Sequence, residues 1–283
     1  GLGDVYKRQV KNIPLFCILL CRDQNSSLSM NPWYSFPLLG LLSISLLKQP
    51  VKSELHADNG CEDPNIGTFL IVSQGIDKDI PIGQLQLETW NKNGTLSGIS
   101  FLRKGRKYRS VAYNGRWQSI NNCNVKVSRS NVDMNSNVLL KTNGDPHFGI
   151  ISTLGVVASE RWFPQVATPC TEDTIAGEVF SIQEGHQFRN GQWQPNRVIQ
   201  REQWRGWRMS GHAISSYSGQ FEEATYQGNF TRIDNCIGSI KQQDSKGVSY
   251  AYVAILRSDG KGYAYLQTQG NALTVAVLDR VLK

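Results

Sequence analysis

Short runs in which apolar and polar residues alternate follow one another along the chain from about residue 67. They are rich in Val, Ile and aromatic residues and are separated by turn-forming pairs such as Asn93-Gly94 and Asn143-Gly144. Alternation of period two indicates half-buried β-strands, and Asn-Gly between two such runs indicates a hairpin. No helical periodicity extends beyond a turn or two. The pattern predicts strands within residues 67–74, 83–90, 98–102, 107–117, 124–129, 137–141, 148–152 and 155–162, and then within 177–183, 196–204, 207–215, 223–233, 238–243, 249–258, 262–268 and 272–281.

Alternation does not decide which face of a strand points inward. The run at 83–90 shows the difficulty, because alternation alone does not assign either of its faces to the interior. One face carries Leu85, Leu87 and Thr89, and the other carries Gln84, Gln86, Glu88 and Trp90.

The second half of the chain repeats the first. The stretch YNGRWQSINNCNV (113–125) is echoed by YQGNFTRIDNCIG (226–238), and the Ser-Gly pair at Ser97 recurs at Ser210, again 113 positions later. A fixed offset of this kind is the signature of a duplicated domain. Eight short strands joined by hairpins in each copy favour an all-β protein of two tandem antiparallel up-and-down β-barrels, since closure removes exposed strand edges. Two β-sandwiches are the alternative. Gly115 and Gly228, each inside a strand before an aromatic residue, are predicted to mark a bulge or bend.

The predicted organisation has five parts. Residues 1–29 resemble a translated adapter and leader, and residues 30–57 have the layout of a signal peptide, with an apolar core followed by a polar stretch. The first repeat covers 58–163, a Pro-containing linker covers 164–169, and the second repeat covers 170–283. After residue 57 no apolar run approaches the ~20 residues of a membrane helix.

Four cysteines remain after residue 57, and they follow the repeat. Cys61 and Cys170 open the two units, and Cys123 and Cys236 lie in the echoed motif. An even number in an exported chain favours disulfides, and the repeat favours Cys61–Cys123 and Cys170–Cys236. A metal site is not expected, because there is no C-x-x-C and the histidines after residue 57 are not at ligand spacing.

These motifs together resemble small exported bacterial β-barrel repeats of unknown function, which are similar to lipocalin and allene oxide cyclase barrels. The resemblance rests on G-T-F at 67–69, N-x-N-G-x-L-S-G at 91–98, Y-x-G-x-W at 113–117 with its following Cys, and V-V-A-S-E-R at 156–161. It implies a bacterial, exported barrel. The second unit departs where residues 203–211 replace the Asn-Gly turn and where Phe230 replaces Trp117. Lipocalins carry G-x-W near their first strand, whereas here it lies mid-domain, so lipid carriage is not carried over.

Charge and motifs exclude several functions. The whole chain has a net charge of +7, but residues 58–283 contain 24 Lys and Arg against 20 Asp and Glu. No dense basic face accompanies this mild excess, so nucleic acid is not an expected partner. The one basic run, 102–109, is interpreted as a charged hairpin tip, and Arg161 and Arg280 are expected to pair with carboxylates at the barrel ends. No phosphate, dinucleotide, nucleophile-elbow or zinc-protease motif is present, so no cofactor is expected.

The segment REQWRGWRMSGH (201–212) has the most unusual composition. Indole and guanidinium groups at a hairpin tip can stack on sugars or other rings and attract anions, whereas the structural alternative is that the two Trp cover the barrel mouth. His212 with Glu202 on the neighbouring strand is the best acid/base pair, although such pairs usually lie on the surface. The candidate ligand-binding residues are Trp204, Arg205, Trp207, Arg208 and His212.

The sequence therefore predicts an exported, periplasmic or extracellular, non-catalytic binding protein. Its ligand would be a small apolar molecule inside a barrel or a cell-envelope component at the Trp/Arg segment. A barrel enzyme of the cyclase or isomerase kind and a purely structural envelope module are the alternatives.

Overall fold

The computed structural model describes residues 60–121, 123–132, 134–217 and 219–281. The leader and signal peptide predicted for residues 1–57 lie outside this part of the chain. The described residues form the strands β1 (Gly67–Asp77), β2 (Ile80–Trp90), β3 (Thr95–Lys104), β4 (Lys107–Asn121), β5 (Asn124–Arg129), β6 (Ser136–Leu140), β7 (Pro146–Ile151) and β8 (Val156–Gln165), followed by the short helix α2 (Glu172–Ile175) and the strands β9 (Gly177–Arg189), β10 (Gln192–Arg205), β11 (Arg208–Tyr217), β12 (Gln220–Asp234), β13 (Ile237–Asp244), β14 (Ser249–Leu256), β15 (Gly262–Gln267) and β16 (Ala272–Arg280).

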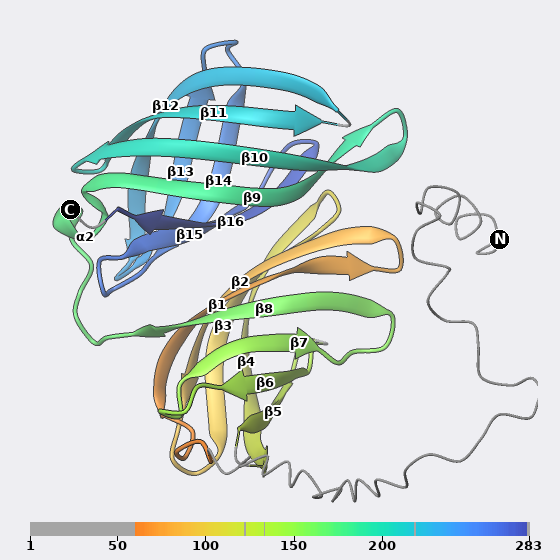
Figure 1. Ribbon diagram of the computed structural model, residues 1–283, viewed down its shortest axis with the longest axis vertical. Helices are drawn as coiled ribbons and strands as arrows, with labels where there is room; N and C mark the ends of the chain where they lie inside the picture. The colour runs from red at the N-terminus through yellow and green to blue at the C-terminus, as the bar shows by residue number, and fades with distance from the viewer. Residues whose placement is uncertain (1–59, 122, 133, 218, 282–283) are drawn as a thin grey trace, which may run out of the picture. The chain divides into compact units, whose positions relative to one another are not determined.

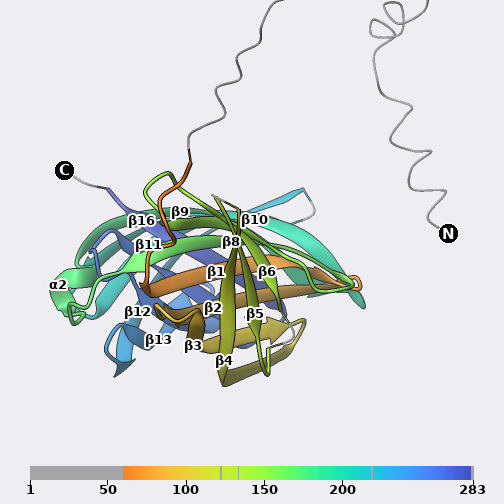
Figure 2. The ribbon, with the colours of Figure 1, turned by 90° about the horizontal axis from the view of Figure 1, so that it is seen from below.

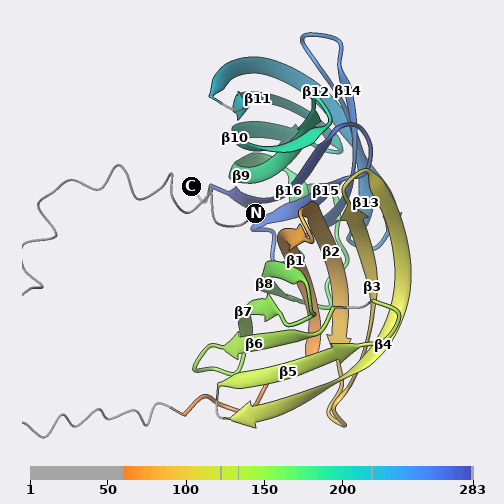
Figure 3. The same cartoon turned by 90° about the vertical axis from the view of Figure 1, so that its right-hand side faces the viewer.

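The strands close into two eight-stranded antiparallel barrels. Strands β1 to β8 form the first, closed by pairing of β1 with β8, and β9 to β16 form the second, closed by β16 with β9 (Figures 1 and 3). Neighbours in sequence are neighbours in the wall, as in an up-and-down barrel. The predicted fold class is confirmed, and the two-sandwich alternative is wrong. Strand β8 runs through Gln165, so the first two residues of the predicted linker are part of a strand.

Gly115 and Gly228 lie at the same place in the two longest strands, β4 and β12. A Cβ atom at Gly115 would lie 2.1 Å from the carbonyl oxygen of Ser128, and one at Gly228 would lie 2.7 Å from that of Lys241. The glycines are therefore required by close approach of the next strand. The predicted irregularity lies further along, between Ser119 and Asn121 in β4 and between Arg232 and Asp234 in β12.

Both predicted disulfides are present. Cys61 is bonded to Cys123 and Cys170 to Cys236, with Cα atoms 5.2 and 5.0 Å apart. Each disulfide ties the segment before a barrel's first strand to the residues just after the fourth strand of that barrel. In the second barrel this segment includes α2, whose Ile175 is buried and which lies beside the end of β16 (Figure 2). Disulfides of this kind belong to an oxidising compartment, which indicates an exported protein.

In β2 the more polar face points into the barrel and the more apolar face points out of it. The polar face of β2 (Gln84, Gln86, Glu88 and Trp90) is the interior face, whereas Leu85 points out of the barrel. Leu85 is nevertheless fully buried, because it belongs to an apolar cluster shared by the walls of both barrels. That cluster consists of Leu70, Val72, Leu85, Phe101, Ile237, Val253, Ile255, Ala264, Leu266, Leu273, Val275 and Val277.

The basic hairpin at 102–109 has its tip at Gly105, as predicted, but Arg103 is not a free surface charge. Its side chain is fully buried and donates hydrogen bonds to the carbonyl oxygens of Gln267 (3.0 Å), Gln269 (3.1 Å) and Gly270 (2.5 Å) in the β15–β16 connection. Burial, with a smaller effect of Arg106, lowers the pKa of Arg103 to about 10. The guanidinium thus joins the two barrels beside the shared apolar cluster.

Within the described part of the chain, no helix combines the length and apolar character needed to cross a membrane.

Candidate functional site

Each barrel encloses a buried glutamate near its disulfide-bonded end. In the first barrel, Glu88 accepts hydrogen bonds from the indole nitrogen of Trp90 (2.7 Å), the hydroxyl of Tyr113 (2.8 Å) and Nε of Arg129 (2.6 Å). All four side chains are buried. A buried carboxylate needs such donors, because without them its removal from water would cost several kcal/mol.

Arg129 also faces a second buried carboxylate, Glu160. The shortest Arg129–Glu160 distance is 3.5 Å, and Glu160 accepts further hydrogen bonds from Ser136 (2.8 Å) and Trp162 (3.1 Å). Burial raises the pKa of Glu160, and the guanidinium opposes that rise. Burial acts to lower the pKa of Arg129, but the two carboxylates hold it above its usual value. The first barrel therefore encloses an ionic cluster of one cation and two carboxyl groups.

Aromatic side chains fill the rest of this end of the first barrel. The ring centroids of Phe69, Trp90 and Trp162 are 5.4 to 6.0 Å apart, and Trp117 stacks on Trp90 at 5.3 Å. The arrangement is that of a structural core.

The second barrel keeps the glutamate but not the cation. Glu202 accepts hydrogen bonds from Trp204 (2.9 Å), Tyr226 (3.1 Å), Tyr263 (2.5 Å) and Gln200 (3.2 Å). Among the described residues no Arg, Lys or His contacts it. Burial raises the pKa of Glu202, and the hydrogen bonds from Tyr263, Trp204 and Tyr226 oppose that rise.

The two clusters share a framework that the sequence carries as Q-x-E-x-W, at residues 86–90 and 200–204. The matched Ser-Gly pairs belong to it as well. A Cβ atom at Gly98 would lie 2.7 Å from the hydroxyl oxygen of Tyr113, and one at Gly211 would lie 2.3 Å from Cζ of Tyr226. Each glycine thus leaves room for the tyrosine ring to cross the strand and reach the glutamate.

Strand register shows what changed between the copies. Arg129 faces Gly115 and Gln242 faces Gly228, so the arginine of the first barrel corresponds to a glutamine in the second. By the same alignment Ser136, Gly149 and Glu160 correspond to Tyr252, Tyr265 and Ala276. The hydrogen bond from Arg129 to Ser136 (2.8 Å) is matched by one from Gln242 to Tyr252 (3.1 Å). The arginine–carboxylate ion pairs of the first interior have no counterpart in the second, which keeps a single buried carboxyl group with uncharged donors.

Replacing Glu202 with Gln will change how stability depends on pH. Folding raises the pKa of Glu202, so the folded protein holds the carboxyl proton more tightly than the unfolded chain does. The free energy of unfolding is therefore greatest at or below the ordinary pKa of 4.5, and it falls as the pH rises through the pKa of Glu202 in the folded state. Gln mimics the protonated acid, so E202Q will be increasingly stable relative to the wild type from pH 4.5 to 8. Urea denaturation across this range measures the difference. The exposed Glu184→Gln serves as the control, and a pH-independent offset for E202Q would contradict the assignment.

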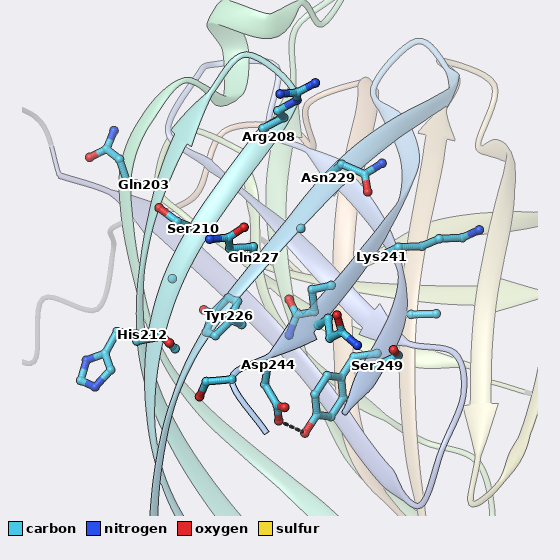
Figure 4. A pocket seen from close by; sticks show the side chains of 18 of the residues that line it. Gln203, Arg208, Ser210, His212, Tyr226, Gln227, Asn229, Lys241, Asp244 and Ser249 are labelled. Atoms are coloured by element: carbon cyan, nitrogen blue, oxygen red, sulfur yellow. Dashed lines mark hydrogen bonds between the residues drawn. The ribbon is translucent and has the colours of Figure 1, made fainter. Parts of the chain in front are cut away.

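A large hollow lies over the outer face of β10 to β14. It has a volume of about 1410 Å³ and is open to solvent, and we call it the outer hollow (Figure 4). Its lining is made of amide, hydroxyl and charged side chains. Residues paired across neighbouring strands point to the same face of a sheet, so the strand register arranges this lining in rows.

One row is cationic and the next is neutral. The cationic row consists of Arg208, Asn229 and Lys241, which line the hollow on β11, β12 and β13, and of Arg205, which is paired with Arg208 on β10 beside it. The neutral row runs Gln203, Ser210, Gln227 and Gln243 across the same strands. Arg205, Arg208 and Lys241 are exposed and form no ion pair or side-chain hydrogen bond with any described residue. Figure 4 shows Arg208, Asn229 and Lys241 on adjacent strands at one side of the hollow.

The structure separates the five candidate residues of the sequence. Arg205, Arg208 and His212 point outward, and Arg208 and His212 line the outer hollow. Trp204 is 1% exposed and lies inside the barrel with Glu202. Trp207 stacks on Phe230, with ring centroids 5.1 Å apart. The indoles therefore do not flank the guanidinium groups on one surface.

The expected acid/base pair of His212 and Glu202 is wrong. His212 is paired with Arg201 in the β10–β11 register, so its side chain leaves the opposite face of the sheet from Glu202. Its Nε2 lies 2.6 Å from Glu223, and both side chains are exposed. This is the surface pair that was the alternative interpretation.

The closing-strand arginines also differ from expectation. Arg280 donates to the carbonyl oxygen of Thr174 (2.6 Å) at the end of α2, and the guanidinium of Arg161 lies 5.2 Å from the ring centroid of Phe163. Neither pairs with a carboxylate of the described chain. Nor do the described residues include a group of three or more His, Cys, Asp or Glu that could hold a metal ion.

The equivalent face of the first barrel lacks the cationic row. At the three positions of Arg208, Asn229 and Lys241, the first barrel has Thr95, Arg116 and Ser128. The first barrel therefore has one cation at these positions, and the second barrel has two. The cationic row is thus a feature of the second copy.

Comparison with known proteins gives no family. No family model matches the chain, and no curated protein matches it. Among solved structures, kievitone hydratase from Nectria haematococca is 8% identical, with 76% of this chain and 89% of that chain covered and a TM-score of 0.26. A protein of unknown function from the DUF3598 family of Nostoc punctiforme is 10% identical, with 77% and 96% covered and a TM-score of 0.21. At these scores neither likeness carries an argument about function.

Proposed function

We propose that this protein is an exported binding protein, periplasmic or extracellular, whose second barrel holds an acidic, hydroxyl-rich ligand in the outer hollow. An acidic glycan of the cell envelope has this chemistry. The observation that carries the proposal is the row of three unpaired cations, Arg205, Arg208 and Lys241, beside a row of neutral amides and a hydroxyl.

The two rows suit the two kinds of group on such a ligand. Guanidinium and ammonium groups attract carboxylates, and Arg can bind one with two parallel hydrogen bonds. Amide and hydroxyl side chains both donate and accept, as sugar hydroxyls do. The hollow is long enough across four strands to contact more than one sugar unit, since neighbouring strands lie ~4.8 Å apart.

The interiors of the barrels support the other functions less well. The first is filled around its ionic cluster, and near its hairpin connections it has a hollow of about 260 Å³ that includes Ile82, Leu102 and Met134. The second has a cavity of about 90 Å³, and both volumes are below the ~300 Å³ of small pockets for drug-sized ligands. The side chains around that cavity are mostly amides and phenols, which disfavours a small apolar ligand. A cyclase or isomerase would need a buried ionisable cluster beside a substrate-sized cavity. The third alternative, a purely structural envelope module, is supported only by the ionic and aromatic core of the first barrel.

Neutralising two cations of the outer hollow will weaken binding of an acidic polysaccharide. Isothermal titration calorimetry at low salt will show that the wild type binds polygalacturonate and not dextran. The double variant R208Q/K241Q will bind polygalacturonate about tenfold more weakly, because each exposed charge contributes up to about 1 kcal/mol. Binding by the wild type will weaken as salt rises.

The control is R116Q/K126Q, which removes the same charge from the equivalent outer face of the first barrel, where both side chains are exposed. Its affinity will match that of the wild type. Equal losses in the two double variants would show general charge attraction and overturn the site. Equal binding of dextran and polygalacturonate would overturn the ligand class.

A further inference from the structure

The interior of the second barrel contains a small polar cavity at the level where the first barrel has its ionic cluster. This cavity, which we call the lumen, has a volume of about 90 Å³ and extends inward from the ends of β11, β12 and β14. Glu222, Asp244 and Lys246 lie among its lining residues near the hairpin connections. The deeper lining residues are Gln183, Asn196, Gln200, Tyr226, Gln242, Tyr252, Tyr265 and Thr274.

The deeper side chains are uncharged, and some of their polar groups form hydrogen bonds with one another. The hydroxyl of Tyr265 lies 2.9 Å from Oε1 of Gln183 and 3.3 Å from Oε1 of Gln200. Gln242 donates to the hydroxyl oxygen of Tyr252 at 3.1 Å. The hydroxyl hydrogen of Tyr252 remains available for a second hydrogen bond, and no described residue accepts it.

One acceptor in this lining has no donor at all. Asn196 is 3% exposed, and its Oδ1 accepts no hydrogen bond from any described residue. Leaving a buried amide oxygen unpaired costs about 1–3 kcal/mol. The first barrel avoids this cost, because the register places Ile82 at the equivalent position of β2.

The exchange already described sets the chemistry of the side chains at this level of the barrel. Arg129 and Glu160 of the first barrel are replaced by Gln242 and Ala276, which are shorter and neutral. Large phenols that carry hydroxyls, Tyr252 and Tyr265, supply new hydrogen-bonding groups at the same level. Where the first copy has an ionic cluster, the second copy therefore has a small polar cavity with a free donor and a free acceptor.

We infer that the lumen binds a small neutral polyol, with one hydroxyl donating to Oδ1 of Asn196 and another accepting from the hydroxyl of Tyr252. A hydroxyl group fits both because it donates and accepts. A cavity of about 90 Å³ holds roughly six water-sized spheres of ~10–15 Å³, which corresponds to a molecule the size of glycerol. An ion does not fit, since the deeper lining offers no countercharge.

This site is separate from the one in the outer hollow. Tyr226, Gln242, Asp244 and Tyr250 line both, but Asn196 lines only the lumen, and Arg208 and Lys241 line only the outer hollow. Variants at these residues therefore test the two proposals independently.

Saturation-transfer NMR with glycerol as the probe, and n-butanol as an apolar probe of similar size, tests the lumen. The wild type and R208Q/K241Q will give a glycerol signal and no n-butanol signal. Asn196→Ile, which installs the first barrel's residue, will lose at least nine-tenths of the glycerol signal and will be as stable as the wild type in urea, since it removes an unpaired buried oxygen.

A second variant covers the case in which Asn196→Ile does not fold. Ala213→Leu adds bulk to a half-buried lining position and will also abolish the glycerol signal. A glycerol signal that persists in either folded variant, or its absence from the wild type, would overturn the inference. An equal n-butanol signal would overturn the ligand class.

Discussion

Replacing Arg129 with Met will lower the free energy of unfolding by about 3–5 kcal/mol. The substitution leaves Glu88 and Glu160 buried without their shared cation, and it leaves the hydroxyl of Ser136 and the carbonyl oxygen of Met134 without the guanidinium. Urea denaturation at pH 7, followed by tryptophan fluorescence, measures the loss. The loss will shrink as pH falls, because Glu160, whose pKa is already raised by burial, can then take up a proton.

Two further variants separate the ionic cluster from a general effect of removing an arginine. Arg116→Met, on the exposed face of the same barrel, will change stability by less than about 0.5 kcal/mol. The double variant R129Q/E160A installs the second barrel's residues and will lose less than R129M, because a single carboxyl group with neutral donors then remains. A loss of under 1 kcal/mol for R129M would show that the cluster is not the stabilising feature assigned to it.

Removing the disulfide of the second barrel by Cys170→Ala and Cys236→Ala will cost about 4 kcal/mol of stability. The crosslink closes a loop with a sequence separation of 66, and the chain-entropy estimate for this length is ~4 kcal/mol. Both sulfur atoms also lie in the apolar core of this barrel, beside Ile175 and Trp204. Thermal and urea denaturation of the double variant measure the cost.

The disulfide of the first barrel provides the matched comparison. Its sequence separation of 62 gives nearly the same entropic contribution, but Cys61 is only half-buried. Cys61→Ala with Cys123→Ala will therefore cost a little less. If both double variants were as stable as the wild type, the crosslinks would have no role in stability, and only their value as a sign of export would remain.

The strands, the duplication and the disulfides could be predicted because each rests on a local or repeated pattern. Period-two alternation marks a strand wherever one face is buried, and Cys123 and Cys236 recur in one motif at equal spacing. The inward face of β2 could not be predicted in this way. Leu85 is buried between the two barrels while Gln86 and Glu88 are buried inside one, so alternation alone left the inward face undecided.

The sequence identified Arg205, Arg208 and His212, which point outward, but it grouped them with Trp204, which lies inside the barrel. The alternation of side chains along a strand explains this error. Arg205 and Trp204 are adjacent in sequence, so in a strand they must leave opposite faces. Glu202 and Trp204 are two residues apart and share the interior. The repeated Q-x-E-x-W would have identified this interior pair from the sequence, because a Glu kept two residues before a Trp in both copies is unusual for a surface strand. The cationic row needed the register of four strands, which local patterns do not provide.

The apolar cluster shared by the two walls has a consequence for how this duplication can evolve. A newly doubled domain can lose either copy without harm, because each copy still has a water-compatible exterior. Here Leu70, Leu85, Val253 and Val275 have made one wall of each copy unsuited to water, and Arg103 of one copy is bonded to the backbone of the other. Deletion of either half would uncover an aggregation-prone surface. The two interiors can therefore differ in chemistry while both copies are kept, because neither copy can be removed without exposing the shared cluster.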